Sequence, residues 1–174
     1  MKRIGILGCG AIGTQIAIAI DSGIIKAELT HVFDNDATKS KGLISKLKQK
    51  PEIVQNVHLL SSNPVDIVVE AASQDAVSDN ALSILQNKRD LMIMSAGALL
   101  DESVFEIVSD ACKEFKRTVY LPSGAISGLD AIKSVKNELD SVTLVTTKHP
   151  KSFKGAKFSD SSDITIDNIS EATT

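Results

Sequence analysis

The sequence predicts an α/β fold of the doubly wound kind, in which helices cover both faces of a mostly parallel sheet. Short apolar runs alternate with amphipathic stretches along most of the chain, a pattern typical of repeated strand–helix units. A glycine-rich turn directly follows the first apolar run. At 174 residues and 43% hydrophobic composition, the chain is long and apolar enough to bury a core. We expect this domain over residues 1–122, followed over residues 123–174 by the start of an incomplete α+β substrate or dimerisation domain.

The strands are predicted where apolar and β-branched residues form short runs. In chain order these are Ile4–Leu7, Leu29–Phe33, Val57–Leu60, Asp66–Glu70, Asp90–Ser95 and Thr118–Leu121. Beyond them, the alternating segments Val142–Thr147 and Ile164–Ile166 predict a β-rich tail.

The helices are predicted where apolar residues recur at a spacing of three or four. They are Ala11–Ser22, Ala37–Lys50, Ser73–Asn87, Glu102–Phe115 and a helix near Leu129–Glu138. Ser73 is the expected N-cap of the third helix, because a serine hydroxyl accepts a backbone hydrogen bond at that position and Asp75 follows in the first turn.

Charge and composition exclude several classes of function. Nineteen basic residues stand against 22 acidic ones, and aromatic residues make up 3% of the chain, so no nucleic-acid-binding surface is expected. The first apolar run is too short for a signal peptide or a membrane span, so we expect a cytoplasmic protein without membrane contact. Cys9 and Cys112 lack a CxxC spacing, so neither a metal site nor a disulfide is expected.

The glycine-rich turn carries the most information. Gly8, Gly10 and Gly13 have the GxGxxG spacing, follow a strand and open a helix, which is the context of a Rossmann dinucleotide-binding unit. The free N–H groups of that helix, at Ala11 and Ile12, suit a pyrophosphate. Asp34, 26 residues after Gly8, ends the next strand and is expected to bind the adenine ribose.

A carboxylate at this position favours NAD over NADP, because it repels a 2′-phosphate. NADP stays possible because Lys39 and Lys41 are near Asp34 in sequence.

Three further segments consist mainly of small residues at strand ends. Glu70-Ala71-Ala72-Ser73 and Ser95-Ala96-Gly97-Ala98 follow neighbouring strands, where small side chains leave room for the nicotinamide half of a cofactor; packing beneath a helix is the alternative. The segment from Pro122 to Asp130, PSGAISGLD, can expose backbone N–H groups and the Ser123 and Ser127 hydroxyls to a carboxylate. An interdomain hinge would have the same composition.

Together, the GCGAIG, EAAS, SAG and PSGAISGLD segments resemble the L-aspartate dehydrogenase family along nearly the whole chain. The resemblance implies an NAD(P)-linked enzyme that oxidises L-aspartate to iminoaspartate, a precursor used by quinolinate synthase in NAD biosynthesis. It also implies that Ala125 contacts the cofactor. The segment from Lys148 to Lys151 resembles a Lys-Pro-Pro stretch of the family.

The predicted cofactor-binding residues are Gly8, Gly10, Ala11, Ile12, Gly13, Asp34, Ala71, Ala72, Ser73 and Ala125; the predicted substrate-binding residues are Ser123 and Lys148.

The catalytic base is left unassigned. The family's catalytic histidine lies in a C-terminal segment beyond these residues, and His31, His58 and His149 do not stand in its motif. His149 is the local candidate to replace it, although a solvated surface histidine is the commoner case; His31 and His58 are expected to be structural.

Two other functions stay open: a dehydrogenase of the same fold acting on another substrate, and a non-catalytic NAD-binding module. A homodimer is the expected assembly by analogy of fold.

Overall fold

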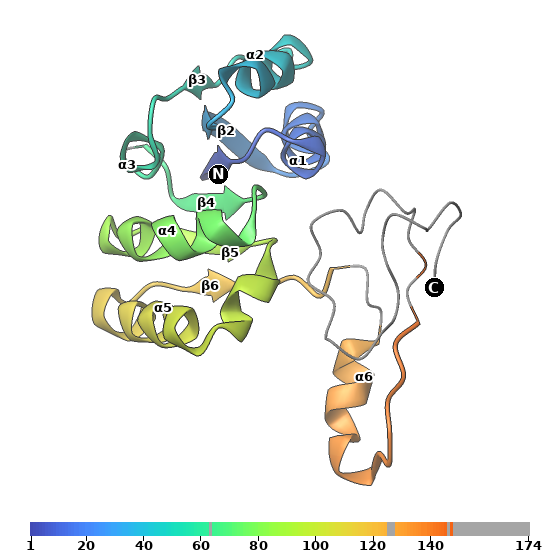
Figure 1. Ribbon diagram of the computed structural model, residues 1–174. Coiled ribbons are helices and arrows are strands. Elements are labelled where there is room, and N and C mark those ends of the chain that lie inside the picture. Colours follow the sequence, from blue (N-terminus) through green and yellow to red (C-terminus); the bar gives the residue numbers. More distant parts are fainter. Residues whose placement is uncertain (63, 125–127, 146, 148–174) are drawn as a thin grey trace, which may run out of the picture. The chain divides into compact units, whose positions relative to one another are not determined.

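The chain forms two compact units, Met1–Ser127 and Gly128–Thr174. A computed structural model describes residues 1–62, 64–124, 128–145 and 147 (Figure 1). The first unit holds the sheet. In the described part of the second, α6 (Leu129–Ser134) is followed by a short 3-10 helix, η2 (Lys136–Glu138). Among the described residues, no helix has the length and apolar character needed to cross a membrane.

Six strands form one sheet in the order β3-β2-β1-β4-β5-β6, and every neighbouring pair is parallel. The strands are β1 (Lys2–Leu7), β2 (Ala27–Phe33), β3 (Glu52–Ile53), β4 (Ile67–Glu70), β5 (Asp90–Ile93) and β6 (Val119–Tyr120). The chain builds outward from β1 to β3, then returns to the other side of β1 with β4. The doubly wound α/β prediction is confirmed, and the strand order reverses between β1 and β4.

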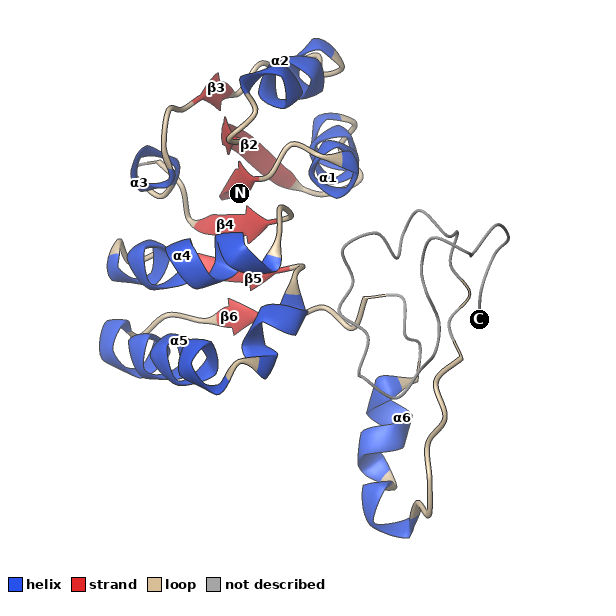
Figure 2. Cartoon of the chain, in the orientation of Figure 1, coloured by secondary structure: helices blue, strands red, loops and turns tan. Residues whose placement is uncertain are grey.

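Helices separate the strands and cover both faces of the sheet (Figures 1 and 2). They are α1 (Ala11–Asp21), α2 (Ala37–Ser45), α3 (Val57–Leu60), α4 (Gln74–Gln86), η1 (Ala96–Leu100) and α5 (Glu102–Phe115). Ser73 caps α4 as predicted, since its side chain accepts the N–H of Ala76 at 3.1 Å. Asp36 and Asp101 cap α2 and α5 in the same way.

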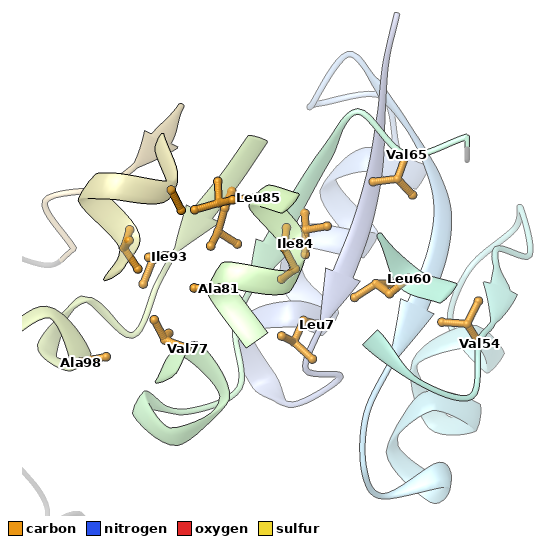
Figure 3. Packing of buried hydrophobic residues seen from close by; sticks show 14 residues of the cluster. Leu7, Val54, Leu60, Val65, Val77, Ala81, Ile84, Leu85, Ile93 and Ala98 are labelled. Carbon is orange, nitrogen blue, oxygen red and sulfur yellow. The ribbon is translucent and has the colours of Figure 1, made fainter. Parts of the chain in front are cut away.

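Two apolar clusters lie on the two faces of the sheet. The larger joins β4 and β5 to α3, α4 and α5, with Leu60, Ile84, Leu85 and Ile93 fully buried in it (Figure 3). The smaller one joins β1 and β2 to α1 and α2. The carboxyl ends of the strands are therefore fixed by packed side chains on both faces of the sheet.

Several predicted elements need correction. Val57–Leu60 is a helix and not a strand, because the Asn56 side chain accepts the N–H of Leu59 at 2.8 Å and caps one helical turn. The two-residue strand β3 was not predicted, and α2 ends at Ser45 instead of Lys50. Residues 142–145 and 147 form no strand, and Ile164–Ile166 lies outside the described residues.

Candidate functional site

The glycine turn after β1 packs against the end of β4. Gly8 has φ +101°, a conformation that side chains rarely adopt, and a Cβ there would lie 2.6 Å from the carbonyl oxygen of Ala71. The Gly8 N–H donates to the carbonyl of Phe33 at 2.8 Å, which ties the turn to β2 as well. A side chain at this position would therefore separate the ends of β1 and β4.

The two other glycines of the motif have different surroundings. A Cβ on Gly13 would lie 1.9 Å from the carbonyl oxygen of Gly8, so this glycine allows α1 to pack on the turn. A Cβ on Gly10 would meet nothing within 4 Å. Gly10 also provides no side-chain cap for α1, so the first N–H groups of this helix have no side-chain acceptor at the N-cap. Ala11 and Ile12, in that first turn, are exposed, Ile12 to 52%.

Asp34 fixes the same turn from the end of β2. Its Oδ2 accepts the N–H of Cys9 at 2.8 Å, and its Oδ1 accepts the N–H of Asp36 at 2.9 Å. One bond holds the glycine turn, and the other shapes the chain that enters α2. Each carboxylate oxygen keeps a further lone pair for a ligand hydroxyl.

A cleft of about 690 Å³ opens beside these groups. Its wall comes from the carboxyl ends of β1, β2 and β4, with α3 and α4. The lining residues are Leu7, Gly8, Gly10, Phe33, Asp34, Asn35, Asp36, Lys39, Asn56, Val57, Ala71, Ala72, Ser73, Asp75, Ala76, Asp79 and Asn80. The structure thus brings together five of the predicted cofactor residues: Gly8, Gly10, Asp34, Ala71 and Ala72, with Ser73 as a sixth at the start of α4.

Sequence reasoning missed the part of the cleft formed by α3 and α4. Asp75, Ala76, Asp79 and Asn80 repeat at helical spacing outside the buried stripe of α4, a signal that the sequence does contain. Val57 carried no such signal, because Val57–Leu60 was predicted to be a strand, and Asn56 lay outside every predicted element.

A second cleft of about 410 Å³ lies between α1 and α2. Cys9, Thr14, Gln15, Lys39 and Lys46 are among its lining residues, and Lys39 also lines the larger cleft. Burial raises the pKa of the Cys9 thiol, so the thiol stays protonated at neutral pH.

Glu70 occupies the end of β4 behind the wall of the larger cleft. Its Oε1 accepts the N–H of Ala72 at 2.7 Å and the hydroxyl of Ser95 at 2.9 Å, and its Oε2 accepts the N–H of Ser95 at 3.0 Å. Only 1% of the residue is exposed. The ends of β4 and β5 are therefore joined through one buried side chain.

Of the other predicted residues, Ala11 lines the second cleft, and Ile12 and Gly13 line neither. Ser123 is exposed and lines neither of them, while Ala125, Ser127, Lys148 and His149 lie outside the described residues. His31 is buried in β2, with Nδ1 3.0 Å from the Thr30 hydroxyl and Nε2 3.7 Å from Glu52. His58 lies in α3, near the Asn87 side chain. In the described part of the chain, no cluster of His, Cys, Asp and Glu could hold a metal ion.

Comparison with known proteins identifies relatives of both the sequence and the fold. Residues 8–122 match the family described as "Homoserine dehydrogenase, NAD binding domain". An L-aspartate dehydrogenase of Nitrosopumilus maritimus is 65% identical over 173 residues, which are 99% of this chain and 64% of that protein. An L-aspartate dehydrogenase of Methanocella arvoryzae is 41% identical over the same shares of the two chains. The chain thus spans about 64% of the length of these curated relatives.

Solved structures share the fold. The aspartate dehydrogenase of Thermotoga maritima has a TM-score of 0.59 and 25% identity, with 89% of this chain and 67% of that chain covered. The WlbA dehydrogenase of Bordetella pertussis, solved with NADH and UDP-GlcNAcA, has a TM-score of 0.66 at 18% identity, with 90% and 50% covered.

Proposed function

This chain belongs to the family described as the NAD-binding domain of homoserine dehydrogenase, and we propose that it is the cofactor-binding part of an L-aspartate dehydrogenase. One observation carries the cofactor assignment. Asp34 and the glycine turn that leads into α1 line one cleft at the point where the strand order reverses, which is where open parallel sheets bind dinucleotides.

The residues of the cleft fit the parts of NAD. Gly10 leaves open space above the start of α1, where a pyrophosphate would accept hydrogen bonds from backbone N–H groups. Asp34 would accept hydrogen bonds from the adenine ribose with the lone pairs that Cys9 and Asp36 leave free. The cleft walls from α3 and α4 would enclose the adenine. We retain Ala11, Ile12, Gly13, Ala71, Ala72, Ser73 and Ala125 as cofactor-binding residues in this proposal.

The assignment of aspartate rests on the relatives. A protein 65% identical over nearly this whole chain is named L-aspartate dehydrogenase. When bound, NAD would accept the hydride from the Cα of aspartate. The protein must then orient the substrate and remove a proton from its amine, which requires a base of near-neutral pKa. Ser123 and Lys148 are proposed substrate contacts, and the base is left to the part of the relatives that this chain does not span.

We also propose that residues 1–122 form the cofactor domain and that residues 123–174 begin the substrate domain. A homodimer and a cytoplasmic location complete the proposal. Light scattering of the purified protein tests the dimer.

The direct test has two stages. Titration of the 174-residue chain with NADH, followed by cofactor fluorescence, should show saturable binding. NADH production from NAD and L-aspartate is then measured for this chain and for a chimera carrying the remaining part of the Nitrosopumilus relative. We expect turnover by the chimera with aspartate and not with homoserine. Absence of NADH binding would refute the cofactor assignment, and turnover of homoserine alone would refute the substrate.

A further inference from the structure

Glu70 is a buried carboxylate that none of the steps above requires. Both of its oxygens accept hydrogen bonds, from two backbone N–H groups and one hydroxyl. Each oxygen accepts one backbone N–H, from Ala72 or Ser95, and these two donors are fixed in direction by the main chain. Charge-assisted hydrogen bonds from main-chain N–H groups stabilise a negative charge at this position.

This negative charge has no cationic partner among the described residues. The ion pairs of that part of the chain join Arg3 to Asp66, His31 to Glu52, Lys113 to Asp110 and Arg117 to Asp90. A charge that is 1% exposed is poorly screened by solvent and costly to keep without an opposite charge. A bound cation would offset that cost.

The position of Glu70 in the fold indicates which part of a ligand lies closest. In this topology a dinucleotide crosses the sheet at the reversal between β1 and β4, with one half over β1, β2 and β3 and the other over β4, β5 and β6. Asp34 assigns the adenosine half to the first group of strands. The nicotinamide half then lies over the ends of β4 and β5, which Glu70 joins through Ala72 and Ser95.

The two redox forms of the cofactor differ in charge at that half. The nicotinamide ring is positively charged in NAD⁺ and neutral in NADH. The carboxylates that line the larger cleft, Asp34, Asp36, Asp75 and Asp79, lie between β2 and α2 or in α4. Asp34 assigns their surroundings to the adenosine half, which is identical in the two forms. Glu70 is the carboxylate placed to distinguish them.

We propose that the buried charge of Glu70 strengthens binding of the oxidised cofactor relative to the reduced one. This inference rests on the proposed NAD-binding function. The effect is electrostatic and its source is a side chain that is 1% exposed, so it should persist at raised ionic strength. A protein that binds NAD⁺ selectively is suited to oxidise its substrate, because the reduced product cofactor is bound less tightly.

The test compares three ligands: NAD⁺, NADH and ADP-ribose, which lacks the nicotinamide. Their Kd values are measured by calorimetry for the wild type, Glu70→Gln, Glu70→Asp and Ser95→Ala. Glu70→Asp keeps the charge but changes the side-chain length, and Ser95→Ala removes one hydrogen bond from the same network. We expect Glu70→Gln to weaken NAD⁺ binding by about fivefold or more, and NADH and ADP-ribose by less than about twofold. Both control variants should keep the NAD⁺ to NADH ratio of the wild type.

Equal weakening of all three ligands in Glu70→Gln would overturn the proposal, because it would show a purely structural role. So would a change of the ratio in Ser95→Ala as large as in Glu70→Gln. If Glu70→Gln does not fold, the wild type decides: it must bind NAD⁺ at least as tightly as NADH. Failure of the wild type to bind ADP-ribose and NADH would instead refute the NAD-binding function itself.

Discussion

The two ends of the β1–β4 pair differ sharply, although the same two strands form both. At the amino end, the Arg3 guanidinium contacts both carboxylate oxygens of Asp66, at 3.1 and 2.8 Å, and the Arg3 N–H donates to the same carboxylate at 2.8 Å. At the carboxyl end, Gly8 lies against Ala71, and the larger cleft opens. One end satisfies its charges internally, while the other leaves backbone groups and space for a ligand.

This difference separates stability from binding along a single strand pair. A charged pair whose atoms already bond to each other has few free groups for a ligand, whereas a turn of small residues lets a ligand approach the main chain. Substitutions at the carboxyl end should therefore change cofactor affinity, and substitutions at the amino end should change stability alone.

The largest effect is expected from Gly13→Ala. Its Cβ would lie 1.9 Å from a backbone oxygen of the turn, so α1 must shift. We expect a loss of about 3 kcal/mol or more in the free energy of unfolding, measured with urea, together with loss of NADH binding.

Gly10→Ala is the matched control, because its Cβ meets no protein atom within 4 Å. It should change stability by less than about 0.5 kcal/mol and still weaken NADH binding. Wild-type stability in Gly13→Ala would show that the turn and α1 are not tightly packed.

Asp34→Ala should have the next largest effect. It removes the acceptor of the Cys9 N–H and the proposed ribose contact, so NADH should bind about tenfold more weakly, or about 1.4 kcal/mol. NADPH binding should weaken less than NADH binding, because the variant lacks the carboxylate that repels a 2′-phosphate. Both constants come from fluorescence titration. An equal loss for the two cofactors would argue against ribose recognition by Asp34.

Ser73→Ala tests how much the N-cap of the helix after β4 contributes to stability. β4 leads into a capped helix and β1 into an uncapped one. Removal of the cap should cost about 1 kcal/mol, measured as a shift in urea midpoint. The control is Ser78→Ala, whose hydroxyl lies within the same helix and donates to Gln74. Equal shifts for the two variants would mean that the Ser73 cap adds no stability.

Asp66→Asn should have the smallest effect and should affect stability alone. Hydrogen bonds from Arg3 hold the pKa of the Asp66 carboxyl well below its ordinary value of about 3.9. A lowered pKa stabilises the folded state at pH values above the unfolded pKa, and this contribution is lost as pH falls through the folded pKa.

Because both side chains are partly exposed, we expect a decrease in Tm of a few degrees at pH 7, which shrinks progressively as the solution is acidified below about pH 4. The Kd for NADH should be unchanged. A weakened Kd would show that the two ends of the strand pair are coupled.

The sequence predicted the parts of this fold that have local signals. The GxGxxG spacing and the Ser73 cap depend on residues near one another in the chain, and Asp34 was predicted from the known spacing between such a glycine motif and the end of the next strand. The structure places all three as expected. The run Val57–Leu60 was wrongly predicted to be a strand, because a run of four residues with three apolar ones fits a strand or a buried helical turn equally well.

The part of the site that depends on distant residues could not be predicted in this way. The hydrogen bonds of Glu70 join it to Ser95, 25 residues later, and exist only because β4 and β5 are neighbours in the sheet. The sequence marked both segments as small-residue strand ends but gave no indication that a buried charge connects them.

Both edge strands of the sheet are short, since β3 and β6 contain two residues each. Exposed edges of long strands invite pairing with other chains and the growth of aggregates. Here each edge strand offers few backbone N–H and C=O groups to which another strand could bind. Self-association through sheet extension is therefore disfavoured for this unit, which should help it stay dispersed at the concentrations that calorimetry requires.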